Sequence, residues 1–102
     1  MVPDRSILHW SIPQLQKHIR HESQDTGKII FTNHALTQMK KRHITQGLVL
    51  ETLRHGKIIL SPEVDYGGDL KCRMEYLVAG LNIRVVIALC DDNPNLVVVT
   101  AI

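Results

Sequence analysis

Hydrophobic residues follow two different spacings in the two halves of the chain. Up to residue 56 they recur every three or four positions, which is the period of an α-helix packed on one side. From Lys57 onward they alternate with polar residues or form short runs, which is typical of β-strands. This change predicts an α+β fold, with N-terminal helices packed on one face of an antiparallel sheet of about four strands. We expect helices near residues 12–24, 33–43 and 46–55, and strands near residues 57–61, 70–79, 82–90 and 95–101.

Start and stop signals delimit the first predicted helix. Ser11 is followed three residues later by Gln14, with Pro13 in the first turn, and this spacing forms a capping box. The polar segment at residues 25–27, Asp-Thr-Gly, ends the helix. The apolar residues of the helix fall on one side, namely Ile12, Leu15 and Ile19.

A short turn joins the next two predicted helices. Thr32 or Asn33 caps the second helix, after an apolar run at residues 29–31 that is either a short strand or an extended lead-in. Thr45 caps the third helix, and Gly56 stands where a left-handed residue commonly ends one. The sides expected to pack consist of Ala35, Leu36, Met39 and His43 in the second helix, and of Val49, Leu50 and Leu53 in the third.

The strand pattern of the second half predicts a hairpin. Alternation runs through residues 72–78 and resumes at Ile83, after Gly80-Leu81. A two-residue turn at Gly80-Leu81 sets the register of the pair. The residues then opposed on the buried face are Met74 with Ile87, Tyr76 with Val85, and Val78 with Ile83. Residues 91–95 form another tight turn, and the apolar run at residues 96–102 favours a central or well-covered strand.

The length of 102 residues and the hydrophobic content of 44% suit one domain with its own core, over residues 1–102. No apolar run approaches the ~20 residues needed to span a bilayer. Residues 1–10 lack the basic start and apolar run of a signal peptide, so we expect a cytoplasmic protein without membrane contact. Cys72 and Cys90 lie in strand-like runs without metal-ligand spacing, which favours reduced thiols; a disulfide between them is the alternative.

The net charge of +2 conceals an uneven distribution. Residues 14–57 carry eight basic and three acidic residues, a net charge of +5, whereas residues 58–102 carry three basic and six acidic residues, a net charge of −3. The helical half also holds five of the six histidines. Such a half suits an anionic partner such as nucleic acid. A solvated helix surface has the same composition, so both interpretations stay open.

The exposed side of the second predicted helix carries the candidate chemistry. His34, Gln38 and Lys41 share that side, and Arg42 lies at its edge, about 12 Å along the axis from His34. Metal-independent RNA cleavage needs a base, an acid and fixed cations for the charge on phosphorus. The candidate catalytic residues are His34, Arg42, Tyr76 and Arg84, and the candidate RNA-binding residues are Gln38, Lys40, Lys41, Arg42 and Arg73.

Structural alternatives exist for these residues. His34 is also placed to bond a backbone group near the start of its helix, and Arg42 to pair with Glu75 of the sheet. His18 and His21 are three residues apart, but nothing else in their segment completes a metal site, so we expect neither metal nor cofactor. The second and third helices also allow a helix-turn-helix interpretation, although an acidic residue in the third would repel phosphate.

Several motifs, taken in order, resemble a known family. They are His34-Ala35 followed by Met39 and Arg42, then Ile44-Thr45, the helix end Leu53-Arg54-His55-Gly56, and Val98-Val99-Thr100-Ala101. With this order and spacing, residues 29–102 are similar to the domain-of-unknown-function family 4258, within the wider group of RelE-like and ParE-like toxin folds. The resemblance implies helices on one face of an antiparallel sheet, and an RNA-cleaving or partner-binding ancestry. The chain departs from RelE-like ribonucleases at its end, where Ile102 stands in place of a frequent tyrosine.

Two functions follow from the residues and the resemblance together. One is a RelE-like toxin of a bacterial-type toxin-antitoxin pair, acting as a metal-independent endoribonuclease. The alternative is a non-catalytic module that binds nucleic acid or protein. The partners to be expected are RNA, an antitoxin-like protein, or a second copy of the chain in a homodimer. Residues 29–102 would form the RelE-like core, and residues 1–28 would form an added helix, a dimer contact or an antitoxin-like cover.

Overall fold

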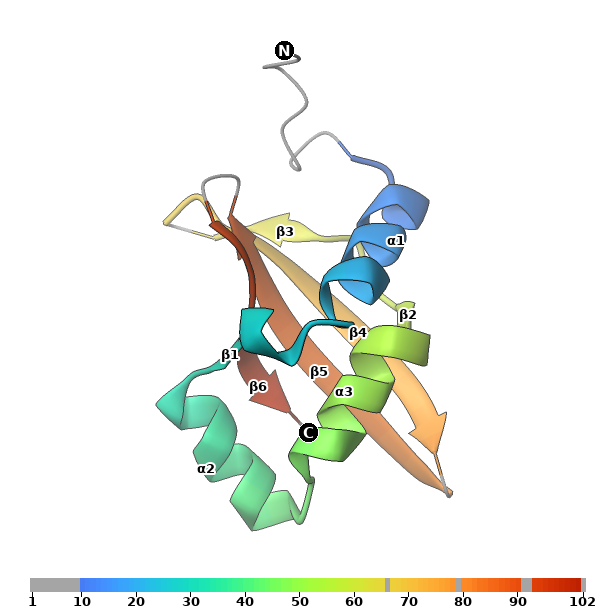
Figure 1. Ribbon diagram of the computed structural model, residues 1–102, viewed down its shortest axis with the longest axis vertical. Coiled ribbons are helices and arrows are strands. Elements are labelled where there is room, and N and C mark those ends of the chain that lie inside the picture. Colours follow the sequence, from blue (N-terminus) through green and yellow to red (C-terminus); the bar gives the residue numbers. More distant parts are fainter. Residues whose placement is uncertain (1–9, 66, 79, 91–92, 102) are drawn as a thin grey trace.

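The computed structural model describes residues 10–65, 67–78, 80–90 and 93–101. These residues form an α+β fold, as predicted, in which three α-helices accompany a mixed sheet (Figure 1). The helices are α1 (Ile12–Glu22), α2 (Asn33–Arg42) and α3 (Gln46–His55), with a single 3-10 turn, η2 (Thr26–Lys28), after α1. The strands are β1 (Ile29–Phe31), β2 (Lys57–Ile58), β3 (Glu63–Val64), β4 (Leu70–Val78), β5 (Leu81–Cys90) and β6 (Asn93–Ala101).

Within the described residues the sheet has six strands rather than about four, in the order β1-β6-β5-β4-β2, with β3 paired to β4. β4, β5 and β6 are antiparallel neighbours, as expected. β1 joins the edge of β6 in parallel, with Ile29 opposite Leu96. Three apolar residues are too few for their spacing to distinguish a strand from a lead-in or to give its direction. The strand expected at residues 57–61 ends at Ile58, although the N–H of Ile59 still donates to Arg73 O of β4 (3.0 Å). Strand pairing with β4 resumes after Pro62, which has no backbone N–H to donate.

The β4–β5 hairpin has a register two residues away from the predicted one. Val78 lies opposite Leu81, and Met74 lies opposite Val85 instead of Ile87. Gly80 has a φ of +80°, a conformation that favours glycine. Because side chains alternate with a period of two, a shift of two residues returns each of them to the same face. The predicted buried face is therefore correct in β5, where Ile83, Val85 and Ile87 are all buried.

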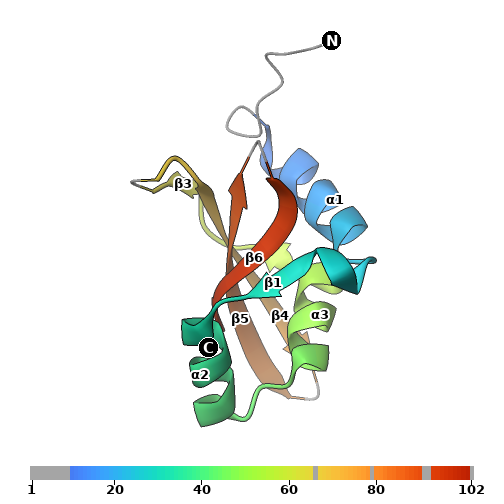
Figure 2. The ribbon, with the colours of Figure 1, turned by 60° about the vertical axis from the view of Figure 1, so that its left-hand side comes forward.

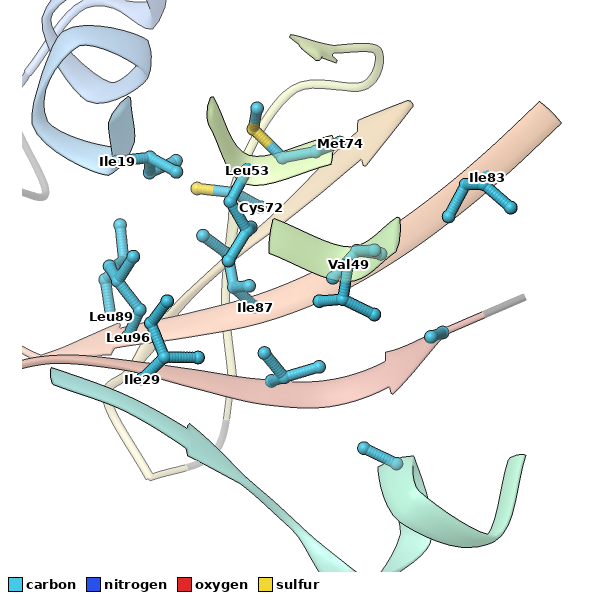
Figure 3. Packing of buried hydrophobic residues seen from close by; sticks show 14 of the residues in the cluster. Ile19, Ile29, Val49, Leu53, Cys72, Met74, Ile83, Ile87, Leu89 and Leu96 are labelled. Atoms are coloured by element: carbon cyan, nitrogen blue, oxygen red, sulfur yellow. The ribbon is translucent and has the colours of Figure 1, made fainter. Parts of the chain in front are cut away.

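One continuous core lies between the helices and one face of the sheet. Figures 1 and 2 show α1 and α3 against that face, while α2 lies beside β1 and packs on β6. Figure 3 shows Leu53 of α3 near Cys72 and Ile87 of the sheet. Every layer contributes large, fully buried side chains, namely Leu15, Ile19, Val49, Leu53, Met74, Val85, Ile87, Leu96 and Val98.

The opposite face of β4 and β5 carries basic side chains. Lys71 and Arg73 are exposed, whereas Cys72 and Met74 next to them are buried. Arg84 is likewise exposed between two buried neighbours in β5. Since successive side chains of a strand point to opposite faces, these three basic side chains point away from the core.

α1 is firmly attached to the rest of the fold. Leu15 and Ile19 are buried in the core, and the predicted capping box forms between Ser11 and Gln14. Three hydrogen bonds connect α1 and the residue after it to α3 and β2: Ile58 N to Gln16 Oε1 (2.7 Å), an Arg20 guanidinium nitrogen to Gly56 O (3.1 Å), and Arg54 Nε to Ser23 O (3.0 Å). Burial and these bonds together fix the helix against α3.

Gly56 ends α3, but the expectation of a left-handed residue there is wrong. Its φ is −76° and its ψ is −177°, which is extended backbone. Glycine stands here because the end of α3 approaches β4 closely. A Cβ at this position would lie 2.5 Å from the carbonyl oxygen of Thr52 and 2.8 Å from that of Glu75.

Cys72 is a free and buried thiol, as predicted, and burial raises its pKa to about 11. The side chain of Cys90 lies outside the described part of the chain, so the prediction of a second free thiol stays a prediction. Residues 1–9, Asp91 and Asp92 of the predicted turn, and Ile102 lie outside it as well. None of the described helices is long and apolar enough to cross a membrane.

Candidate functional site

Thr32 positions the start of α2 on the sheet. Its backbone N–H donates to Val98 O (3.1 Å), and its hydroxyl donates to Val99 O (3.2 Å). The same hydroxyl accepts the N–H of Ala35 (3.1 Å) and so caps the helix. The side chain of Thr32, and not that of the neighbouring His34, therefore joins β6 to the start of α2.

The packed side of α2 is narrower than predicted. Ala35 and Met39 are buried, but Leu36 is 41% exposed. His43 was expected on the packed side and is instead an exposed residue after the helix end. A helix that rests on so narrow a stripe leaves most of its circumference in solvent, and the exposed residues include His34, Thr37, Lys40, Lys41 and Arg42, with Gln38 half-buried.

A tight C-terminal turn ends α2. His43 has φ 57° and ψ 37°, the left-handed conformation predicted for Gly56. Its N–H donates to Lys40 O (3.4 Å), and the N–H of Ile44 donates to Met39 O (2.9 Å). This pair of bonds is a Schellman motif, and the buried side chains of Met39 and Ile44 both belong to the core. The turn therefore stops the helix directly after its basic residues.

The charge of α2 is entirely positive. The helix contains no acidic residue, and Lys40, Lys41 and Arg42 follow one another in its last turn. Among the described residues, the four ion pairs involve other side chains, so these three cations have no acidic partner within 4.0 Å. The negative end of the helix dipole favours cations at this end. The three cations point in directions about 100° apart around the helix, and each, without an acidic partner among the described residues, is suited to contact a phosphate group.

The sheet residues that were expected to complete a catalytic site lie elsewhere. Arg73 and Arg84 point from the face opposite the helices, and Arg84 Nε donates to Glu75 Oε2 at 2.8 Å. The hydrogen bond from Arg84, supported by one from Asn82, lowers the pKa of Glu75 below its ordinary value. Glu75 thus pairs with Arg84. The pair of Glu75 with Arg42, which was the structural alternative for Arg42, does not form within the described residues.

Tyr76 occupies a third position. Its ring lies 5.9 Å from that of His55 at the end of α3, with an angle of 36° between the ring planes. β4 carries Tyr76 and is separated by β5 from β6, the strand on which α2 packs. The structure therefore places His34, Gln38, Lys40, Lys41 and Arg42 on one helix, α2, but does not bring Arg73, Tyr76 or Arg84 beside it.

His55 and Lys57 were not predicted as site residues, but they line a hollow with Tyr76. Its volume is about 300 Å³, and its other lining residues are Glu75, Leu77 and Asn82. Both residues flank the point where the helical period ends, which was visible in the sequence. Their proximity to Tyr76 depends on the pairing of Lys57 with Glu75, which periodicity alone does not reveal.

Metal-ligating side chains do not cluster in the described ranges, where no group of three or more from histidine, cysteine, aspartate and glutamate could hold an ion. His18 and His21 turn to different neighbours. The rings of His18 and Trp10 pack edge to face with their centroids 5.2 Å apart, and His21 Nε2 lies 3.7 Å from Glu22 Oε2. Burial lowers the pKa of His18 below its ordinary value, against a smaller opposing effect of Glu22.

Comparison with protein families matches residues 31–102 to the family described as Domain of unknown function (DUF4258). The chain belongs to this family. The DUF4258 segment begins at Phe31, so it contains α2, α3 and the strands from β2 to β6, while α1 precedes it. No curated protein and no solved structure matches the chain.

Proposed function

We propose that this DUF4258 protein is a non-catalytic nucleic-acid-binding module that holds phosphate groups on the exposed side of α2. The observation that carries the proposal is the row of Lys40, Lys41 and Arg42, exposed at the end of a helix without acidic residues. Neutralising phosphates releases counterions, and this supplies most of the affinity of non-specific nucleic-acid binding. The partner of this surface is RNA in our proposal.

The positions of the other candidates favour binding over cleavage. A catalytic acid or base must come within about 2.6–3.2 Å of the atom whose proton it transfers. His34 and Arg42 lie at opposite ends of α2, about 12 Å apart along its axis. Arg84 is engaged by Glu75, and Tyr76 rests beside His55. A toxin-type endoribonuclease would need these groups to converge on one phosphodiester.

Likeness to the RelE-like fold belongs to the proposal as well. Its support is the antiparallel set β4, β5 and β6 with helices against one face. The parallel strand β1 and the helix α1 are additions to that plan. We infer a common architecture from these features.

Binding of a labelled single-stranded RNA is the direct test, measured by fluorescence anisotropy over a range of salt concentrations. The double variant Lys41→Ala/Arg42→Ala should bind more weakly. Its plot of log affinity against log salt should be less steep by about 1.4, from about 0.7 for each phosphate contact on a single strand. A matched control is Lys17→Ala/Lys71→Ala, which removes two exposed lysines outside α2 and should keep the parent slope.

Equal binding by the two double variants would refute the proposed surface. Cleavage is tested in the same samples by gel electrophoresis of the RNA after prolonged incubation. Cleavage by the parent that is lost in a folded His34→Ala variant would replace the binding module with a ribonuclease. Absence of RNA binding by the parent at low salt would favour the protein-binding alternative.

A further inference from the structure

A hollow opens beside β4 where α3 ends. β2 begins at Lys57, opposite Glu75, so in the described structure no strand covers this edge of β4 from Tyr76 to Val78. α3 ends at His55, just before this point. The hollow of about 300 Å³ between them is at the small end of the range of ligand sites, which runs from about 300 to 1,000 Å³.

Most polar groups in the hollow are hydrogen-bond donors, namely His55, Lys57, Tyr76 and Asn82. Glu75 is its one carboxylate, and its Oε2 already accepts from Arg84 Nε at 2.8 Å and from Asn82 Nδ2 at 3.1 Å. Lys57 forms no ion pair with any described residue. His55 has a loose contact of 3.7 Å with Glu51. The arrangement leaves the ammonium of Lys57 available for an anion, while Arg84 offsets the charge of Glu75.

Two rings and an apolar rim form the rest of the wall. Tyr76 is half-buried in β4, and its ring stands 5.9 Å from that of His55 at a tilt of 36°. Leu77 at the rim is 67% exposed, the highest value among the large hydrophobic side chains that are described as exposed. A flat ring held by a strand offers a stacking surface for another flat ring. A ligand stacked on the Tyr76 ring could also cover the side chain of Leu77.

We propose that this hollow is a nucleotide-binding site, in which a base stacks on Tyr76 beside His55 and a phosphate binds Lys57. Lys57 lies opposite Glu75 and shares its face of the sheet, whereas Tyr76 points to the other face, so the two groups meet at the open edge of β4. There an aromatic surface and a cation without an acidic partner among the described residues match a base and a phosphate joined in one small molecule. The site is separate from the α2 surface and does not depend on it. The ligand is either a free nucleotide or one residue of a single-stranded nucleic acid.

The test is a titration of the isotope-labelled protein with adenosine monophosphate, adenosine and inorganic phosphate, followed by nuclear magnetic resonance. Adenosine monophosphate should shift the resonances of His55, Lys57 and Tyr76, and should bind more tightly than either component. Tyr76→Ala should weaken this binding by about tenfold or more, whereas Tyr76→Phe, which keeps the ring, should retain it.

Lys57→Ala supplies a variant at an exposed position, in case the loss of the half-buried tyrosine disturbs folding. It should reduce the affinity for adenosine monophosphate to that for adenosine, while Lys17→Ala, a matched loss of one exposed lysine, should not. Phosphate binding as tight as that of adenosine monophosphate would overturn the nucleotide assignment. So would a folded Lys57→Ala or Tyr76→Ala protein with unchanged affinity, or the absence of shifts in the hollow.

A single-stranded hexa-adenylate distinguishes the two sources. If the natural ligand is a strand, the oligonucleotide binds more tightly than the mononucleotide and loses affinity in Tyr76→Ala. If it is a free nucleotide, the mononucleotide binds at least as tightly. The two proposals fail separately, because the nucleotide site is judged by Tyr76 and Lys57 variants with a mononucleotide, and the α2 surface by Lys41 and Arg42 variants with RNA.

Discussion

Replacing Gly56 by alanine should destabilise the protein, although the backbone conformation of Gly56 is open to every residue. The added Cβ would meet two carbonyl oxygens, at 2.5 Å on Thr52 and at 2.8 Å on Glu75. Neither is the mobile tip of a side chain. Thr52 O belongs to the last turn of α3 itself and Glu75 O to β4, so the end of α3 must both distort and move away from β4. Overpacking of this kind costs about 1–3 kcal/mol, and the hydrogen bond from Arg20 to Gly56 O would weaken at a further cost of about 0.5–1.5 kcal/mol. We expect a total loss of about 2–4 kcal/mol.

Gly47→Ala is the matched control, since it makes the same chemical change in the same helix. A Cβ at Gly47 would find only Thr45 Oγ1 at 3.6 Å, an ordinary contact. Alanine should therefore stabilise α3 there, by up to about 0.5–1 kcal/mol. Urea unfolding measures both effects, and Gly56→Ala should lower the midpoint by about 1–2 M at an unchanged slope. The proposed close approach of α3 and β4 is refuted if Gly56→Ala is as stable as the parent or as Gly47→Ala.

Two further predictions concern histidines. His43→Gly should raise stability by about 0.5–1 kcal/mol, because glycine adopts the left-handed conformation at φ 57° without the strain of a Cβ; a lower melting temperature would show that the imidazole contributes more than the strain costs. Burial holds the pKa of His18 below 6.5, so the stability from its neutral form should be complete above pH 6.5 and decline as the pH falls through the folded pKa. Urea unfolding followed by Trp10 fluorescence should show this decline in the parent and a flatter profile in His18→Gln, and parallel profiles would contradict it.

Local spacing predicted the helices well because each is specified by its own residues. Ser11 with Gln14 caps α1 and Thr45 caps α3, as the sequence indicated, and Thr32, one of the two candidates, caps α2. The pairing of distant segments was harder to predict from the sequence. The parallel contact of β1 with β6 joins residues more than sixty positions apart, and the two-residue shift in the β4–β5 hairpin changes neighbours without changing faces. Periodicity reports faces, so it cannot detect such a shift.

The sequence predicted the exposed basic residues of α2 but not the hollow beside Tyr76. Exposure of Lys40 and Lys41 follows from the helical period, which places them away from Ala35 and Met39. Arg42 lies seven residues after Ala35, so the period alone would place it near the packed side, yet it is exposed at the last position of α2. Arg73 and Tyr76 are an odd number of residues apart in one strand, so they point to opposite faces, and this parity was available in the sequence. The approach of His55 to Tyr76 depends on where α3 meets β4, and therefore on the space that Gly56 leaves open.

β6 lies between β1 and β5, although it follows both of them in the chain. While the ribosome is making the protein, β1 and the start of α2 consequently have no strand to bind until β6 has emerged. α2 packs mainly on β6, and the hydroxyl of Thr32 donates to Val99 O. Contacts between such distant segments slow folding. The basic surface on α2 is thus one of the last parts to assemble, so a nascent or truncated chain that lacks β6 would already carry its cations but could not hold them in place.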